Sequence, residues 1–87
     1  MKAISAVLTI LIVVNVAFAQ VEEARDAIDR GEYVRAVNIL SAALGERPTA
    51  DAYLYLSIAY RRMKEYPKAE DTLREGDRKS TRLNSSH

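Results

Sequence analysis

The chain has 87 residues, no cysteine, one histidine and a formal net charge of +1. The absence of cysteine excludes a disulfide scaffold and a cysteine-based zinc site. The near balance of charges gives no electrostatic argument for nucleic-acid binding. We therefore expect no metal, no other cofactor and no nucleic-acid partner.

The N-terminus has the pattern of a secretory signal. Lys2 supplies the positive charge, Ile4 to Val14 is a mainly apolar run, and Ala17 and Ala19 are small residues at the spacing of a cleavage site. We predict that residues 1–19 are a signal peptide, cleaved after Ala19. The protein is then exported, with the bacterial periplasm or envelope as the expected destination.

The alternative for this segment is an uncleaved membrane anchor. Ala3 to Ala19 is at or below the roughly 17–25 residues needed to span a bilayer, and it contains Asn15. Membrane contact is expected only through this segment, and only if it is not cleaved.

The C-terminus, residues 77–87, has no helical periodicity. Its eleven residues resemble, one for one, the conceptual translation of a common sequencing adapter. We expect an artefactual disordered tail and a natural protein that continues beyond Gly76; a natural polar tail is the alternative. The only histidine, His87, lies in this tail. Residues 20–76 then have nine Lys and Arg against eleven Asp and Glu, a net charge of −2.

Two helices are expected in the first half of the remaining chain. The segment from Val21 to Arg30 is a short helix that ends at Gly31. A second helix begins near Tyr33, with Gly45 as its expected C-cap and Pro48 preventing its continuation. Its apolar stripe, spaced i, i+3, i+4, i+7, i+10 and i+11, is Tyr33, Ala36, Val37, Leu40, Ala43 and Leu44.

Two further helices follow. Thr49 is suited to be the N-cap of a third helix within Ala50 to Met63, with Asp51 in its first turn. Pro67 is suited to the first turn of a fourth helix. The third helix has an apolar stripe of Ala52, Tyr53, Leu56, Ala59, Tyr60 and Met63. Because the turns within each pair are short, the paired helices are predicted to be antiparallel neighbours.

Three residues of the second helix recur 33 positions later in the fourth. Tyr33, Ala36 and Leu40 return as Tyr66, Ala69 and Leu73. A period in the low thirties built from helical spacing is typical of stacked helix pairs, each of which buries its apolar face on the next. Such a stack is a binding scaffold rather than a catalytic fold.

The residues of the third and fourth helices resemble the tetratricopeptide repeat. The resemblance rests on Tyr53, Leu56, Ser57, Ala59 and Tyr60, followed by Tyr66, Ala69 and Leu73. It implies an all-α fold of antiparallel helix pairs, a fragment of an α-solenoid preceded by a signal-peptide helix and followed by a disordered tail. Residues 20–48 would be a degenerate or partial repeat, and 49–76 a second, truncated repeat. The implied structural core is Tyr33, Ala36, Leu40, Tyr53, Leu56, Ala59, Tyr60, Tyr66, Ala69 and Leu73.

The chain departs from the family pattern at several positions. Ser57 stands where glycine is usual, and Lys64 stands where the first turn has Gly31. A left-handed Lys64 would cost about 1–2 kcal/mol. Gln20, Glu23 and Ala24 occupy the positions of the family's aromatic residue, leucine and glycine, so the first helix is either a degenerate cap or a different N-terminal helix.

The resemblance also implies where a partner would bind. In this family the first helix of a pair lines a groove, and the matching residues here are Leu54, Tyr55, Ile58, Arg61 and Arg62. The groove would take a peptide or helix of another protein, and the arginines would attract an acidic segment. The alternative occupant of this second apolar face is a missing repeat or the signal helix. An isolated fragment would also be prone to self-association.

The predicted function is that of an exported adaptor without catalytic activity. Catalytic sequence motifs are absent, and adjacent acidic pairs such as Glu22 and Glu23 point to different sides of a helix. The alternative is the repeat segment of a larger envelope enzyme or secretion component whose catalytic part lies elsewhere.

Overall fold

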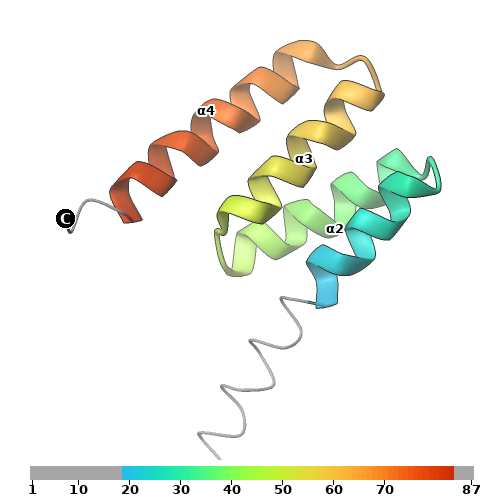
Figure 1. Cartoon of the computed structure of the whole chain (residues 1–87), viewed down its shortest axis with the longest axis horizontal. Coiled ribbons are helices and arrows are strands. Elements are labelled where there is room, and N and C mark those ends of the chain that lie inside the picture. Colours follow the sequence, from blue (N-terminus) through green and yellow to red (C-terminus); the bar gives the residue numbers. More distant parts are fainter. Residues whose placement is uncertain (1–18, 84–87) are drawn as a thin grey trace, which may run out of the picture.

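The computed structural model describes residues 19–83, which form helices joined by short turns, with no strand in this range (Figure 1). Residues 19–29 are helical and are followed by α2 (Tyr33–Glu46), α3 (Ala50–Arg62) and α4 (Tyr66–Leu83). The predicted signal peptide, apart from Ala19, lies outside the described residues. Within them, no helix has the length and apolarity required to cross a membrane.

The first turn has the glycine geometry expected from the sequence. Gly31 has φ +81°, a left-handed conformation that a residue without a side chain adopts at little cost. The Gly31 amide donates a hydrogen bond to the Ile28 carbonyl at 3.0 Å, and the Glu32 amide to the Ala27 carbonyl at 2.8 Å. These bonds satisfy carbonyls at the end of the first helix and reverse the chain into α2.

The end of α2 differs from the expected glycine cap. Gly45 lies inside the helix, which continues to Glu46, and the C-cap is Arg47 in an extended conformation. The Arg47 amide still reaches the Ala43 carbonyl at 2.9 Å. The physical reason is Pro48, because the residue before a proline is pushed into the extended region and cannot continue a helix.

The start of α3 is capped as predicted. Thr49 is extended, and its Oγ1 accepts a hydrogen bond from the Ala52 amide at 3.2 Å. Asp51 occupies the first turn, and Arg61 and Arg62 the last. Both charge types therefore lie at the helix ends that the macrodipole favours.

The turn from α3 to α4 repeats the first turn with a less suitable residue. Lys64 has φ 63°, and it is the only described non-glycine residue with positive φ. The Glu65 amide donates to the Tyr60 carbonyl at 2.9 Å, so the hydrogen bonding of the first turn is reproduced. The side chain at position 64 makes this geometry strained.

The structure differs from the expected disordered tail over residues 77–83, which are helical and continue α4 to Leu83. Glu75 supports this extension through ion pairs with Arg78 at 2.6 Å and Lys79 at 3.7 Å. No glycine or proline follows Gly76 to end the helix. Residues 84–87 lie outside the described part of the chain, and the origin of the segment stays a prediction.

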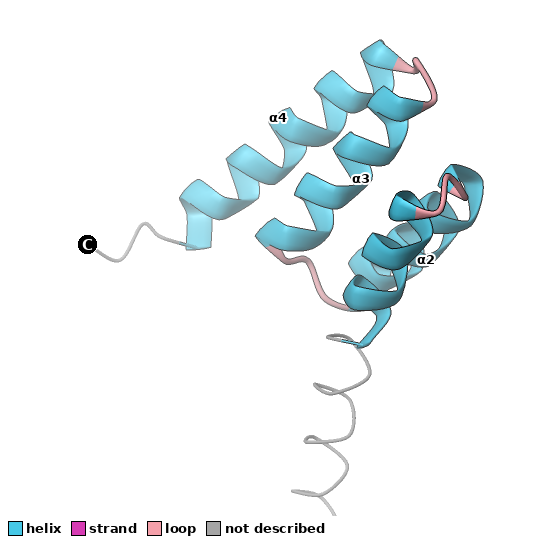
Figure 2. Ribbon diagram, turned by 45° about the vertical axis from the view of Figure 1, so that its right-hand side comes forward, coloured by secondary structure: helices cyan, strands magenta, loops and turns pink. Residues whose placement is uncertain are grey.

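The core lies between the first helix, α2 and α3. Side chains from all three form one buried cluster, to which α4 contributes none. The α4 helix packs against α3 (Figure 2). Of the expected repeat core, Tyr33 and Tyr60 are half-buried, whereas Tyr66 and Leu73 are exposed. The buried cluster comprises Ala24, Ala27, Ile28, Ala36, Leu40, Ala52, Leu56 and Ala59, and Tyr53 and Ala69 are buried between α3 and α4.

The strained turn gives a first prediction. Lys64→Gly should raise the free energy of unfolding by about 1 kcal/mol, because it removes the left-handed side chain. The matched reverse change, Gly31→Lys, should lower it by a similar amount. Chemical denaturation monitored by circular dichroism measures both. Equal stability of Lys64→Gly and the parent chain would show that the turn is not strained.

The two helical glycines give a second prediction. A Cβ on Gly76 would lie 2.7 Å from Tyr53 Cβ and 2.9 Å from its Cγ, whereas a Cβ on Gly45 meets nothing within 4 Å. Gly76→Ala should therefore destabilise the fold by about 1–3 kcal/mol through overpacking. Gly45→Ala should stabilise it by about 0.5–1 kcal/mol through helix propensity. Thermal unfolding of both variants compares them, and stabilisation by Gly76→Ala would contradict the close approach.

Candidate protein-interaction surface

One side of α3, opposite its fully buried residues, has both apolar and charged residues. Asp51, Leu54, Ile58 and Arg61 are spaced i, i+3, i+7 and i+10, so they share one face of the helix, which we call the outer face of α3. Leu54 is 47% exposed, Ile58 is half-buried and packs in part against the core cluster, and both charged residues are exposed. An exposed large apolar residue between charges is suited to contact with another molecule.

A surface depression lies at the C-terminal end of this face. Its volume is about 340 Å³, and it is lined by Ile58, Arg61, Arg62 and Tyr66. The lining combines an aliphatic side chain, two guanidinium groups and a phenol. Neither arginine forms an ion pair with another residue of the described range. Both guanidinium groups are therefore free to meet an acidic group from outside.

The five residues predicted to line a groove are not equivalent in the structure. Leu54, Arg61 and Arg62 are exposed on or beside the outer face, whereas Tyr55 and Ile58 are half-buried and pack in part against the core cluster. Substitution of Tyr55 would therefore disturb packing as well as binding. Tyr66, which was assigned to the core, lines the depression instead. The sequence signal for this placement is Pro67, because the residue before it lies at the start of α4, next to the end of α3.

The exposure of Tyr66 and Leu73 follows from the arrangement of the helix pairs. Leu40, 33 residues before Leu73, has no exposed surface because α3 covers the first pair, whereas Leu73 is 45% exposed. No helix of the described range covers the second pair in the same way. Leu54 and Leu73 consequently border a second depression of about 200 Å³, together with Ala50, Tyr53, Gly76 and Asp77.

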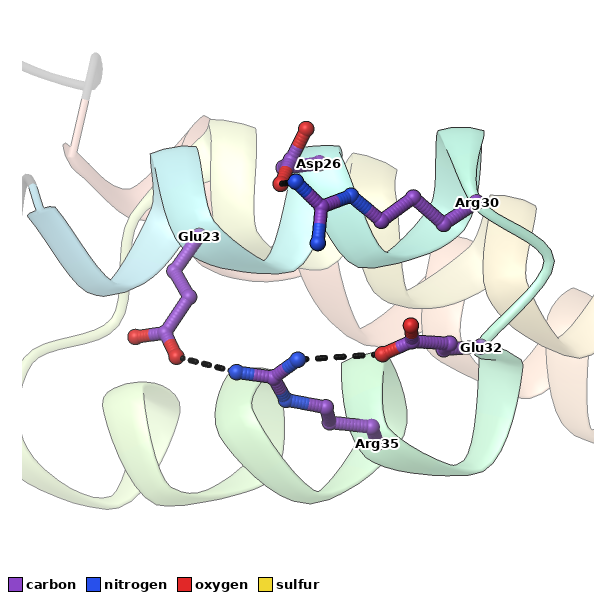
Figure 3. Close-up of polar contacts among 5 residues, drawn as sticks. All are labelled: Glu23, Asp26, Arg30, Glu32 and Arg35. Atoms are coloured by element: carbon purple, nitrogen blue, oxygen red, sulfur yellow. Dashed lines mark hydrogen bonds and ion pairs between the residues drawn. The ribbon is translucent and has the colours of Figure 1, made fainter.

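A cluster of ion pairs between the first helix and α2 has a structural role. Arg35 on α2 donates to Glu32 at 3.0 Å and to Glu23 on the first helix at 2.9 Å (Figure 3). The hydrogen bond with Glu32 and that with Glu23 raise the pKa of Arg35, which therefore stays charged. Arg30 and Asp26 pair separately at 3.2 Å. The cluster joins the two helices of the first pair and faces solvent.

The described residues have no grouping suited to catalysis by a metal ion. Among residues 19–83, no three His, Cys, Asp or Glu side chains are close enough to hold a metal. Ser57, the buried hydroxyl of α3, donates to the Leu54 carbonyl at 2.6 Å and is satisfied within its own helix. Its hydroxyl hydrogen therefore serves a bond within the helix.

Successive antiparallel helix pairs, with small residues where the helices meet, define this chain as a helix-pair repeat protein. The family model described as Tetratricopeptide repeat matches residues 27–81, and the chain belongs to this family. Repeats of this family are generally interaction modules for other proteins. No curated protein and no solved structure matches the chain.

Proposed function

We propose that the protein is a non-catalytic scaffold that binds a segment of another protein at the outer face of α3 and the depression beside it. The observation that supports this proposal is the depression lined by Ile58, Tyr66 and two arginines, neither of which forms an ion pair within residues 19–83. Family membership supports the same class of function. The only ligand in this proposal is a segment of another protein.

The chemistry of the depression suggests the character of the partner segment. An apolar side chain would contact Ile58 and the ring of Tyr66, and a carboxylate would accept hydrogen bonds from Arg61 or Arg62. Arginine forms bidentate, charge-assisted bonds with carboxylates, which set orientation as well as affinity. We therefore expect a segment that combines an apolar residue with a nearby acidic one.

Arg62→Glu tests this proposal. The change replaces an attractive charge with a repulsive one at an exposed position, so we expect partner capture to fall roughly tenfold. The measurement is quantitative mass spectrometry of proteins retained by the immobilised chain from an envelope extract of the source cells. Arg25→Glu, an exposed charge reversal on the first helix, is the control and should retain capture. Equal capture by the Arg62→Glu variant and the parent chain would refute the assigned surface.

We propose in addition that the protein is exported, on the basis of the signal pattern in residues 1–19. Expression with the natural N-terminus should yield a chain that begins at Gln20 and appears in the periplasmic fraction. Intact-mass analysis measures the start of the chain. A mass that includes residues 1–19 would contradict cleavage, and retention in the membrane fraction would then indicate an anchor.

A further inference from the structure

We propose that the outer face of α3 also pairs with the same face of a second copy of this chain, in an antiparallel, two-fold arrangement. The inference rests on the proposed function, because it names one occupant of the surface assigned there. The two copies associate through α3, and not through the exposed residues of α2 or the first helix.

The spacing of the outer face is symmetric about residue 56. Leu54 and Ile58 lie two positions on either side of it, and Asp51 and Arg61 lie five positions on either side. A two-fold interface brings residue i against residue j and residue j against residue i. With the axis at the level of residue 56, each Leu54 meets the Ile58 of the other copy, and each Asp51 meets the other Arg61.

Charge complementarity selects the antiparallel direction. Asp51 is in the first turn of α3 and Arg61 in the last, both are exposed, and neither pairs with a residue in the described range. An antiparallel pairing therefore forms two opposite-charge contacts. A parallel pairing would place like charges together, which is unfavourable. Opposed helix dipoles agree with the same direction.

The apolar middle of the face has room for a side chain from the other copy. Leu54 is 47% exposed and borders the depression of about 200 Å³ that also includes Ala50 and Leu73. The Ile58 side chain of a second copy would be placed at Leu54, beside this depression. Burial of Leu54 and of the part of Ile58 that is still exposed provides the attraction, and the charged ends set the register.

Such an interface involves one helix from each copy, so it is small and corresponds to a weak, reversible dimer. The test is sedimentation equilibrium of the full chain from about 10 µM to about 1 mM, the range in which weak association is measurable. We expect the mean mass to rise from that of a monomer toward that of a dimer. A monomer throughout this range would overturn the proposal, while partner capture would still test the proposed function independently.

A charge exchange tests the register. Arg61→Glu places a glutamate opposite Asp51 in both symmetric contacts, and Asp51→Arg places two arginines together, so each single variant should raise the dissociation constant roughly tenfold. The double variant restores opposite charges at both contacts and should return most of the affinity. Failure of the double variant to recover, with its helical circular dichroism intact, would overturn the antiparallel register.

Leu54→Ser provides a test that does not depend on charge. Leu54 is exposed, so the substitution should leave the helical signal intact and abolish dimerisation within the measured range. Val34→Ser is the matched control, because Val34 is an apolar residue on α2 with 63% exposure and is not part of the outer face of α3. Loss of dimerisation in Val34→Ser, or its retention in Leu54→Ser, would assign the interface to another surface.

Discussion

The close approach of helices at small residues is the constraint on which the rest of the structure depends. Ala24, Ala36 and Ala69 are almost completely buried, and Gly76 lies so near Tyr53 that even a methyl group would meet its side chain. Larger residues at these positions would separate the helices, and the other core side chains would lose their contacts. The recurrence of Ala43 as Gly76, 33 positions later, extends the repeat that was recognised from Tyr33, Ala36 and Leu40.

Local chemistry could be predicted from the sequence, whereas exposure could not. The Thr49 cap, the left-handed Gly31 and the strained Lys64 depend on a few neighbouring residues, and the structure has all three. Leu40 and Leu73 have the same residue type and repeat position, yet only Leu40 is buried, because burial depends on which helix packs above. Residues 77–83 lack apolar periodicity, so the sequence predicted no helix there. In the structure this part of α4 is helical, and ion pairs between side chains three and four residues apart stabilise its start.

The same distinction applies to the interaction surface. The family resemblance implies a groove at Leu54, Ile58, Arg61 and Arg62; the structure places Ile58, Arg61 and Arg62 around one depression, and binding of a partner there stays a prediction. Tyr55 and Ile58 both pack in part against the core cluster, which helical spacing did not indicate. α3 is therefore both the helix that closes the core and the one that offers a surface, which restricts the substitutions it tolerates to its exposed positions.

The off-centre position of the core has a consequence for local opening. The first helix, α2 and α3 share one buried cluster, whereas α4 contacts α3 and has few buried residues over 66–79. Detachment of α4 would leave that cluster intact, but displacement of α3 would break it. The free energy of local opening is thus graded along the chain, lowest in α4 and approaching the global value in α3.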